Sequence, residues 1–245
     1  DAAADFLDDD HLHEECGLYG TYGHIDSAAH TALGLHSLQH RGQESVGIVS
    51  YDGEQFHSQR ALGLVGDNFS SEEVIKQLPG KSAIGHVRYS TSGDTALRNV
   101  QPLFSEFRFG GLAVAHNGNL TNSYAIRRTL IERGSIFQST SDTETIIHLI
   151  ARSEFGPVVD RLTDALTQLE GAYSLVALTQ KKLIGARDPS GVRPLVIGRL
   201  GDAYIMTSET CALDIMGAKF VRDVDPGEIV IIDENGLHSL KPFTK

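Results

Sequence analysis

Short strand-like runs cluster at both ends of this sequence, and helix-like runs lie between them. Turn signals such as YDG, DPSG and DENG separate many of the strand-like runs. A parallel doubly wound sheet would instead need strands and helices in regular alternation. The order of the runs therefore favours an α+β layered fold with mainly antiparallel sheets, forming one domain after residue 15.

The helix-like segments carry small or apolar residues at helical spacing and begin with residues suited to helix starts. We expect helices within 27–41, 70–78, 122–134, 142–153 and 157–169, the first with Ser27 as its N-cap. Strands are expected within 16–22, 45–51, 60–66, 82–90, 110–118, 172–179, 182–188, 194–200, 203–208 and 228–233.

The net charge of −11 comes mainly from the N-terminal segment. Residues 1–15 hold seven acids and no Lys or Arg, which leaves −4 for the rest of the chain. By composition alone this segment resembles a solvated tail. Because the chain has neither a basic stripe nor an apolar run of about 20 residues, we expect no nucleic-acid or membrane partner. No signal-peptide pattern is present, so a cytoplasmic location is expected.

The sequence contains only two cysteines, Cys16 and Cys211, too few for a four-cysteine zinc or iron–sulfur site. We expect no metal site and no cofactor in this chain. Cys16 follows two glutamates and precedes Gly17, whose lack of a side chain would let another group approach closely. These features suggest a nucleophile, although most free cysteines are small buried apolar residues.

Arg88 follows the apolar run SAIGHV and precedes a loop rich in small hydrogen-bond donors. A guanidinium at a strand end can hold a carboxylate by two parallel hydrogen bonds. Asn117 and Gly118 follow another apolar run. They offer a side-chain amide and a backbone N–H suited to an oxyanion hole. The structural alternatives are a surface salt bridge for Arg88 and an ordinary turn for Asn117–Gly118.

Asp142 opens a predicted helix, where its carboxylate can bind an ammonium group or simply cap the helix. At each of these positions taken singly, the structural alternative is the more frequent one. Together the residues describe a pocket for an amino acid whose side chain is an amide. No histidine-based triad is evident, so the base for the thiol must come from elsewhere.

The motifs CGLYG, LHSLQHRGQESVGIV, GHVRYSTSGD, AHNGNLTN, STSDTE and DPSGVRPL resemble those of the class II glutamine amidotransferases. Within that class they resemble the glutaminase domain of the amidophosphoribosyltransferase family. The resemblance runs from about residue 14 to residue 245. The glucosamine-6-phosphate synthase branch would show YRGYDS and RWATHG where this chain has QHRGQES and RYSTSG.

The resemblance implies a four-layer αββα sandwich of the N-terminal-nucleophile (Ntn) hydrolases, with two mainly antiparallel sheets between helical layers. It implies a propeptide at 1–15, a glutaminase domain at 16–245, and cleavage between Glu15 and Cys16. A free α-amine has a pKa of ~7.7–8.0, near the ~8.5 of a thiol, so it can exchange a proton with the sulfur at neutral pH. The uncleaved chain is therefore expected to be inactive.

By the same resemblance, the Cys16 thiolate attacks the side-chain amide of L-glutamine and forms a thioester that water converts to glutamate. Arg88 would hold the α-carboxylate and Asp142 the α-ammonium. Asn117 and Gly118 would hold the oxyanion. Supporting positions are expected at Arg41, Gly42 and Thr91. DPSGVRPL and SETCALD are expected to be mainly structural.

The family's second half is a phosphoribosyltransferase domain, and no motif of such a domain occurs here. We therefore expect a fragment whose full-length form passes ammonia to phosphoribosylpyrophosphate (PRPP), in the first step of purine synthesis. Full-length relatives use Mg²⁺ with PRPP, some carry an iron–sulfur cluster, and a homo-oligomer is expected. The alternatives are a catalytically silent module with the same fold and an Ntn hydrolase for another amide.

Overall fold

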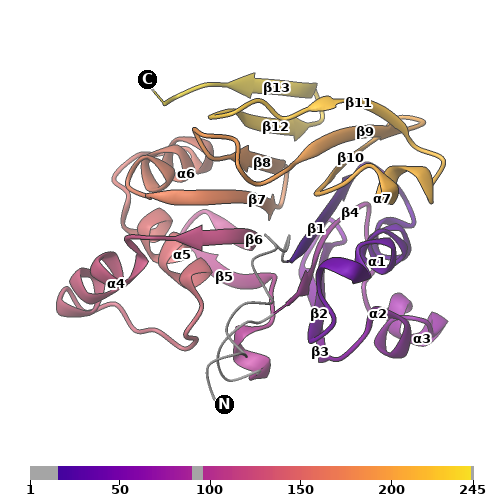
Figure 1. The fold of residues 1–245 in the computed structure, drawn as a ribbon, viewed down its shortest axis with the longest axis horizontal. Helices are drawn as coiled ribbons and strands as arrows, with labels where there is room; N and C mark the ends of the chain where they lie inside the picture. Colours follow the sequence, from indigo (N-terminus) through magenta and orange to yellow (C-terminus); the bar gives the residue numbers. More distant parts are fainter. Residues whose placement is uncertain (1–15, 90–95, 244–245) are drawn as a thin grey trace, which may run out of the picture.

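The computed structural model describes residues 16–89 and 96–243. Two antiparallel sheets stack face to face, and helices cover both outer faces. In Figure 1 the helices α4–α6 lie on the left, α1–α3 and α7 lie on the right, and the strands run between them. This is the expected four-layer αββα sandwich.

The first sheet has seven strands, in the order β11-β9-β10-β1-β4-β2-β3. Its strands are β1 (Gly17–Tyr22), β2 (Ser45–Tyr51), β3 (Phe56–Leu62), β4 (Ser82–Arg88), β9 (Val196–Leu200), β10 (Ala203–Thr207) and β11 (Lys219–Asp223). β1 lies between β4 and β10, so the segment that begins just after Cys16 occupies the middle of the sheet.

The second sheet has six strands, in the order β13-β12-β8-β7-β6-β5. Its strands are β5 (Leu103–Phe107), β6 (Gly110–Leu120), β7 (Gly171–Thr179), β8 (Leu183–Arg187), β12 (Ile229–Asp233) and β13 (Gly236–Leu240). β6 is the longest strand, and it pairs with β7 from Leu112 to Leu120.

Helices of unequal length cover the two sheets. Those over the seven-stranded sheet are α1 (Ser27–Ser37), α2 (Val65–Asn68), α3 (Glu72–Lys76) and α7 (Cys211–Asp214). Those over the six-stranded sheet are α4 (Ser123–Glu132), α5 (Asp142–Arg152) and α6 (Val158–Thr167). Two 3₁₀ turns complete the set, η1 (Gln39–Arg41) and η2 (Leu97–Asn99).

Apolar side chains fill three layers of core, one between the sheets and one under each helical layer. The layer between the sheets contains Leu18, Ile84 and Met206 from one sheet and Val176 and Leu178 from the other. All five are fully buried. Because strands with both faces covered read as nearly continuous apolar runs, this layering explains why the inner strands were visible in the sequence.

Several elements differ from those expected. The strand expected within 60–66 is displaced toward the N-terminus, since β3 spans Phe56–Leu62 and a short helix, α2, begins at Val65. Ser27 is the first helical residue of α1, and Asp26 occupies the N-cap position. Three strands, β5, β11 and β13, were not expected.

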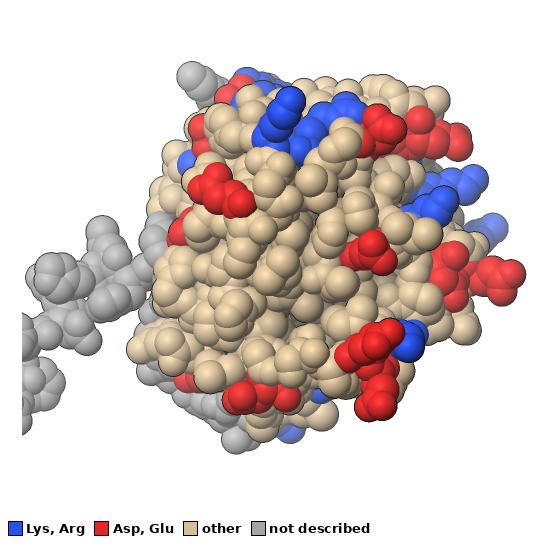
Figure 2. Space-filling model, turned by 90° about the vertical axis from the view of Figure 1, so that its right-hand side faces the viewer, with Lys and Arg blue, Asp and Glu red and all other residues tan. Residues whose placement is uncertain are grey.

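Figure 2 shows the face covered by α1–α3 and α7. Charged side chains gather toward its edges, and much of its centre carries neither sign. A groove of about 390 Å³ lies between these helices and is lined mainly by apolar residues such as Leu33 and Phe69. No helix in the described part of the chain is both long enough and apolar enough to cross a membrane.

Candidate active site

Cys16 lies immediately before β1, and its backbone is held from both sides by Arg41. The Cys16 amide donates to the Arg41 carbonyl at 2.8 Å. The Arg41 guanidinium donates through Nε to the Cys16 carbonyl at 2.7 Å. Arg41, at the end of η1, is 2% exposed. The Cys16 thiol lies 3.8 Å from the Tyr89 carbonyl oxygen, so it faces the end of β4.

The backbone at Cys16 is strained. Its φ is +65°, and among the described residues no other non-glycine has a positive φ. For an L-residue this left-handed conformation costs roughly 1–2 kcal/mol. Strain of this kind is kept where the surrounding structure enforces it, often at functional positions.

Arg88 is the last residue of β4 and lies beside Cys16 in the sheet. β1 and β4 are antiparallel with Gly17 opposite Val87, so the residue before Gly17 meets the residue after Val87. A Cβ atom on Gly42 would lie only 2.6–2.8 Å from the Arg88 backbone. Glycine at position 42 therefore lets the η1 loop pack directly against the end of β4.

Asn117 and Gly118 are part of β6 and do not form a turn, because the strand continues to Leu120. Asn117 is 1% exposed, and its side-chain nitrogen has no hydrogen-bond partner among the described residues. Gly118 has φ +141°, and a Cβ atom there would lie 2.1 Å from the Ala172 oxygen. Only glycine fits at position 118, directly after the buried Asn117 side chain.

Asp142 is the first residue of α5, with Ser141 as N-cap. Its carboxylate lies 3.5 Å from His116 Nδ1 and accepts from the Leu120 amide at 3.4 Å, so it is tied to the end of β6. Burial raises the pKa of the Asp142 carboxyl, but His116 and two backbone amides lower it by more, so the net pKa lies below its usual value. Asp142 is therefore an anion at neutral pH.

These segments meet where the two sheets face each other. β1 of the first sheet and β6 of the second are in contact. His86 on β4 and His116 on β6 are both buried there, at 1% and 2% exposed. Burial is the main cause that lowers the pKa of His86 to about 3, with smaller electrostatic contributions from the neighbouring His116 and Arg88. His86 is therefore neutral beside Arg88.

Two groups of supporting residues escaped the sequence analysis. Glu209 is ion-paired to Arg41, so it orients the side chain that holds Cys16. Burial raises the pKa of the Glu209 carboxyl, but Arg41 and His40 lower it by more, and the net pKa is below its usual value. The other group is the histidine pair. A polar residue inside an apolar run, as in GHVR and AHNG, is the signal that could have found it.

The DPSG motif, residues 188–191, stabilises the backbone of β7, the strand that pairs with β6. Asp188 is fully buried, and its carboxylate accepts backbone N–H bonds from Tyr173 and Ser190 at 3.2 and 2.8 Å. Tyr173 lies opposite Gly118 in the β6–β7 pair. This is the structural role expected for the motif. The predicted positions Glu15 and Thr91 lie outside the described residues.

The site thus combines a thiol, a guanidinium, a carboxylate and a buried amide donor that no described residue pairs with. A cation and an anion at separate positions suit a zwitterionic amino acid. The amide donor suits an oxygen atom that gains negative charge during a reaction.

Comparison with known proteins agrees with this chemistry. A family model described as a glutamine amidotransferase domain matches residues 86–214. The chain is 58% identical over 229 residues to an amidophosphoribosyltransferase of Rhizobium etli, covering 94% of this chain and 46% of that protein. It is 48% identical to an amidophosphoribosyltransferase of Bacillus subtilis, covering 93% of this chain and 48% of that protein.

A solved structure supports the same relationship. Glutamine PRPP amidotransferase of B. subtilis, in complex with ADP and GMP, superposes with a TM-score of 0.89 at 45% identity. The match covers 94% of this chain and 50% of that one. The chain therefore spans about half the length of the relatives it matches.

Proposed function

This chain belongs to the glutamine amidotransferase domain family, and we propose that it hydrolyses L-glutamine to glutamate and ammonia through a thioester on Cys16. The observation that carries the proposal is the buried Asn117 amide, which has no hydrogen-bond partner among the described residues and precedes Gly118. Leaving a buried donor unpaired costs about 1–3 kcal/mol. The substrate oxyanion is the partner that we assign to it.

The reaction begins when the Cys16 thiolate attacks the side-chain amide carbon of glutamine. Negative charge moves to the carbonyl oxygen, which accepts hydrogen bonds from the Asn117 side chain and the Gly118 N–H. The C–N bond then breaks, and the nitrogen takes up a proton and leaves as ammonia. Water attacks the thioester, which releases glutamate and returns the thiol.

Substrate binding uses the two ionic groups of the site. Arg88 pairs with the α-carboxylate, and its planar fork allows two parallel hydrogen bonds. Asp142, an anion because its pKa is depressed, pairs with the α-ammonium. Two binding groups of opposite charge select a free amino acid and disfavour an amide substrate that lacks an α-carboxylate and an α-ammonium. This preference argues against a hydrolase for another amide.

The proton on the thiol requires a base, and we assign this role to the α-amine of Cys16 after cleavage of the Glu15–Cys16 bond. An amide nitrogen cannot accept the proton, whereas a free amine with a pKa of ~7.7–8.0 can. The Cys16 nitrogen already donates to the Arg41 carbonyl, and this contact would fix the freed amine. Cleavage would also release the backbone from its strained φ of +65°.

For the full-length protein we propose that the ammonia reaches PRPP on a phosphoribosyltransferase domain and gives phosphoribosylamine, the first step of purine synthesis. The support is the name shared by the relatives and the half-length match. Mg²⁺ with PRPP, and any iron–sulfur cluster, would belong to that other half. A homo-oligomer in the cytoplasm completes the proposal.

The nucleophile is tested by substitution and by labelling. Cys16→Ala should abolish glutaminase activity, and Cys211→Ala should leave it nearly unchanged. A diazo-ketone analogue of glutamine should label Cys16 alone in processed protein, as read by peptide mass spectrometry. Labelling at Cys211, or full activity of Cys16→Ala, would disprove the assignment. A catalytically silent module would show neither labelling nor turnover.

A further inference from the structure

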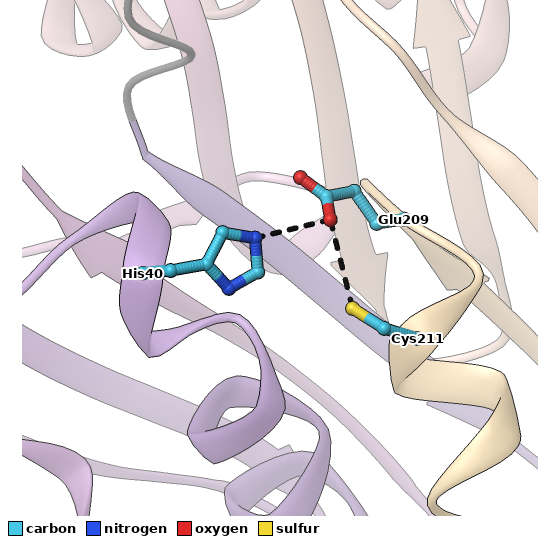
Figure 3. A group of neighbouring side chains, drawn as sticks. All are labelled: His40, Glu209 and Cys211. Atoms are coloured by element: carbon cyan, nitrogen blue, oxygen red, sulfur yellow. Dashed lines mark hydrogen bonds and ion pairs between the residues drawn. The ribbon is translucent and has the colours of Figure 1, made fainter.

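Three side chains that can bind a metal ion, from two distant parts of the sequence, meet beside Arg41. His40 belongs to η1, Glu209 lies in the turn after β10, and Cys211 begins α7. Figure 3 shows the three side chains pointing toward one another. We propose that His40, Glu209 and Cys211 form a binding site for a divalent cation of borderline softness, such as Zn²⁺.

The spacing of the donor atoms fits such an ion. Glu209 Oε2 lies 3.1 Å from His40 Nε2 and 3.6 Å from Cys211 Sγ, and the three donors lie within 4.8 Å of one another. Tetrahedral zinc with bonds of ~2.0–2.3 Å separates neighbouring ligand atoms by roughly 3.3–3.7 Å. Small side-chain adjustments would bring all three donors onto one ion.

The chemistry of the donors selects the class of metal. One imidazole nitrogen, one carboxylate oxygen and one thiolate match Zn²⁺ or Co²⁺, whereas Mg²⁺ and Ca²⁺ prefer oxygen ligands alone. The cluster is open to solvent, since the side chains of His40 and Glu209 are 56% and 32% exposed. An ion can therefore enter, and water can fill a fourth position.

Arg41 is a cation beside the cluster, and its position is compatible with a bound ion. Its guanidinium takes the other carboxylate oxygen, Glu209 Oε1, and leaves Oε2 facing His40 and Cys211. A hydrogen-bonded partner of this kind commonly orients a metal-binding carboxylate. When the Cys211 thiol releases its proton to solvent on binding, the two anions outweigh Arg41 and leave one net negative charge for the ion.

Occupancy of this site would reach Cys16 through two contacts. An ion bound to the Glu209 carboxylate weakens the ion pair between Glu209 and Arg41. Arg41 in turn donates a hydrogen bond to the Cys16 carbonyl. We expect a bound ion to loosen this hold and to slow glutamine hydrolysis. This consequence rests on the proposed function, whereas binding of the ion does not.

Cobalt provides the direct test, because a thiolate bound to Co²⁺ gives a charge-transfer absorption band. The chain contains only two cysteines, so in Cys16→Ala protein any such band must arise from Cys211. We expect one Co²⁺ per chain, a band that Zn²⁺ displaces and Mg²⁺ does not, and no band after the further change Cys211→Ser. Circular dichroism checks that each variant is folded.

A matched control separates the site from general histidine binding. His238 is 54% exposed and faces Asp233, which is paired with Lys182, so it repeats the His–carboxylate–cation arrangement without a cysteine. In the Cys16→Ala background, His40→Ala should weaken Co²⁺ binding at least about tenfold, since even outer-shell partners contribute ~10–100-fold. His238→Ala should leave it unchanged. Absence of the band, or equal effects of the two substitutions, would overturn the proposal.

The coupling is tested separately on processed protein with an intact Cys16. Each variant is compared with its own rate without metal. Zn²⁺ should inhibit the unsubstituted chain and His238→Ala at the same concentration, and His40→Ala only at a concentration at least about tenfold higher. Equal inhibition of all three would place the inhibitory ion on Cys16 itself and would refute the coupling.

Discussion

Under the proposed function, Asn117 is a residue that trades stability for catalysis. Its side-chain nitrogen is buried with no hydrogen-bond partner among the described residues. Asn99 is similarly buried, at 3% exposure, but its amide exchanges two hydrogen bonds with Thr140 at 2.9 and 3.0 Å. Two buried asparagines of the same domain thus differ in whether their donors are used in the resting molecule.

Substituting these two asparagines should give opposite results. Asn117→Ala should lower kcat by about 10²–10³, the usual effect of removing an oxyanion donor. Because it removes an unpaired buried donor, it should leave the thermal midpoint unchanged or higher. Asn99→Ala should lower the midpoint instead. Calorimetry and steady-state kinetics measure both, and unaltered kcat in Asn117→Ala would exclude the oxyanion role.

Substitution of Arg88 or Asp142, the two charged groups proposed to bind glutamine, should weaken substrate binding. Arg88→Lys keeps the charge but loses the planar fork, and Asp142→Asn removes the anion. Each should lower kcat/KM for glutamine about ten- to a hundredfold, mostly through KM, since a hydrogen bond to a charged group contributes ~1.5–3 kcal/mol. Initial rates over a range of glutamine concentrations test this. An unchanged kcat/KM in both variants would contradict the binding model.

Candidate residues were picked from the sequence where a motif places a polar side chain at one end of an apolar run. Arg88 and Asn117 follow such a run and Cys16 precedes one, and their chemical roles stay predictions. Glu209 was not picked in this way, because it contacts Arg41 across 168 positions of sequence and no local pattern links the two. The cluster with His40 and Cys211 was missed for the same reason.

At the scale of elements, β6 is a strand whose pairing with β7 overrides the local turn preference of its sequence. An Asn–Gly pair after an apolar run is typical of a turn. Here β7 continues to pair with β6 as far as Leu120 and Gly171, so the strand carries Asn117 and Gly118 through the site. Placing these residues on a rigid strand fixes the donors more firmly than a loop would.

Another element-scale feature ties the two sheets together. Arg222 of β11 donates two hydrogen bonds of 2.7 Å to Glu228, which precedes β12 in the other sheet. Glu228 is 2% exposed and also accepts from the Asp225 amide. Burial raises the pKa of the Glu228 carboxyl, but Arg222 and the amide lower it by more, so the net pKa lies below 4.5.

Glu228→Gln should therefore destabilise the protein in a pH-dependent way. A carboxyl whose pKa falls on folding contributes stability above its unfolded pKa, and this contribution is lost as the pH falls through the folded value. We expect a loss of about 1–3 kcal/mol at pH 7, moderated because Arg222 is partly open to water. The difference from the unsubstituted chain should shrink as the pH falls below about 4.5.

Urea unfolding at several pH values measures this difference. Asp225→Asn provides the control, because its pair with Lys241 at 2.7 Å is exposed on both sides. That change should alter the free energy of unfolding little at any pH. A constant effect of Glu228→Gln from pH 7 to below about 4 would rule out the linkage.

At the scale of the whole molecule, the order of apolar runs was sufficient to predict a layered α+β fold. Strands enclosed on both sides, such as β7 and β12, are nearly continuous apolar runs and were expected. The missed strands β5, β11 and β13 are all edge strands. Their side chains are mostly exposed or half-buried, so the apolar signal that marks a strand is weak there.

The state of the N-terminus should control activity of the entire chain. Protein whose intact mass includes residues 1–15 should show little or no glutaminase activity, because Cys16 then lacks a free amine. A chain that begins at Cys16 after removal of an initiator Met should be active without further processing. Glutamate release, measured beside intact mass, compares the two forms. Full turnover by the unprocessed form would refute the proposal that cleavage before Cys16 is needed for activity.

Arg41 holds Cys16 through the amide and the carbonyl of the cysteine, two groups that every residue except proline has. Any residue with the same backbone would be held in the same place. The position of the nucleophile is therefore independent of the atom that performs the attack. Serine or selenocysteine at position 16 would be presented to the same oxyanion donors, which makes this domain a scaffold for comparing oxygen, sulfur and selenium as nucleophiles in one geometry.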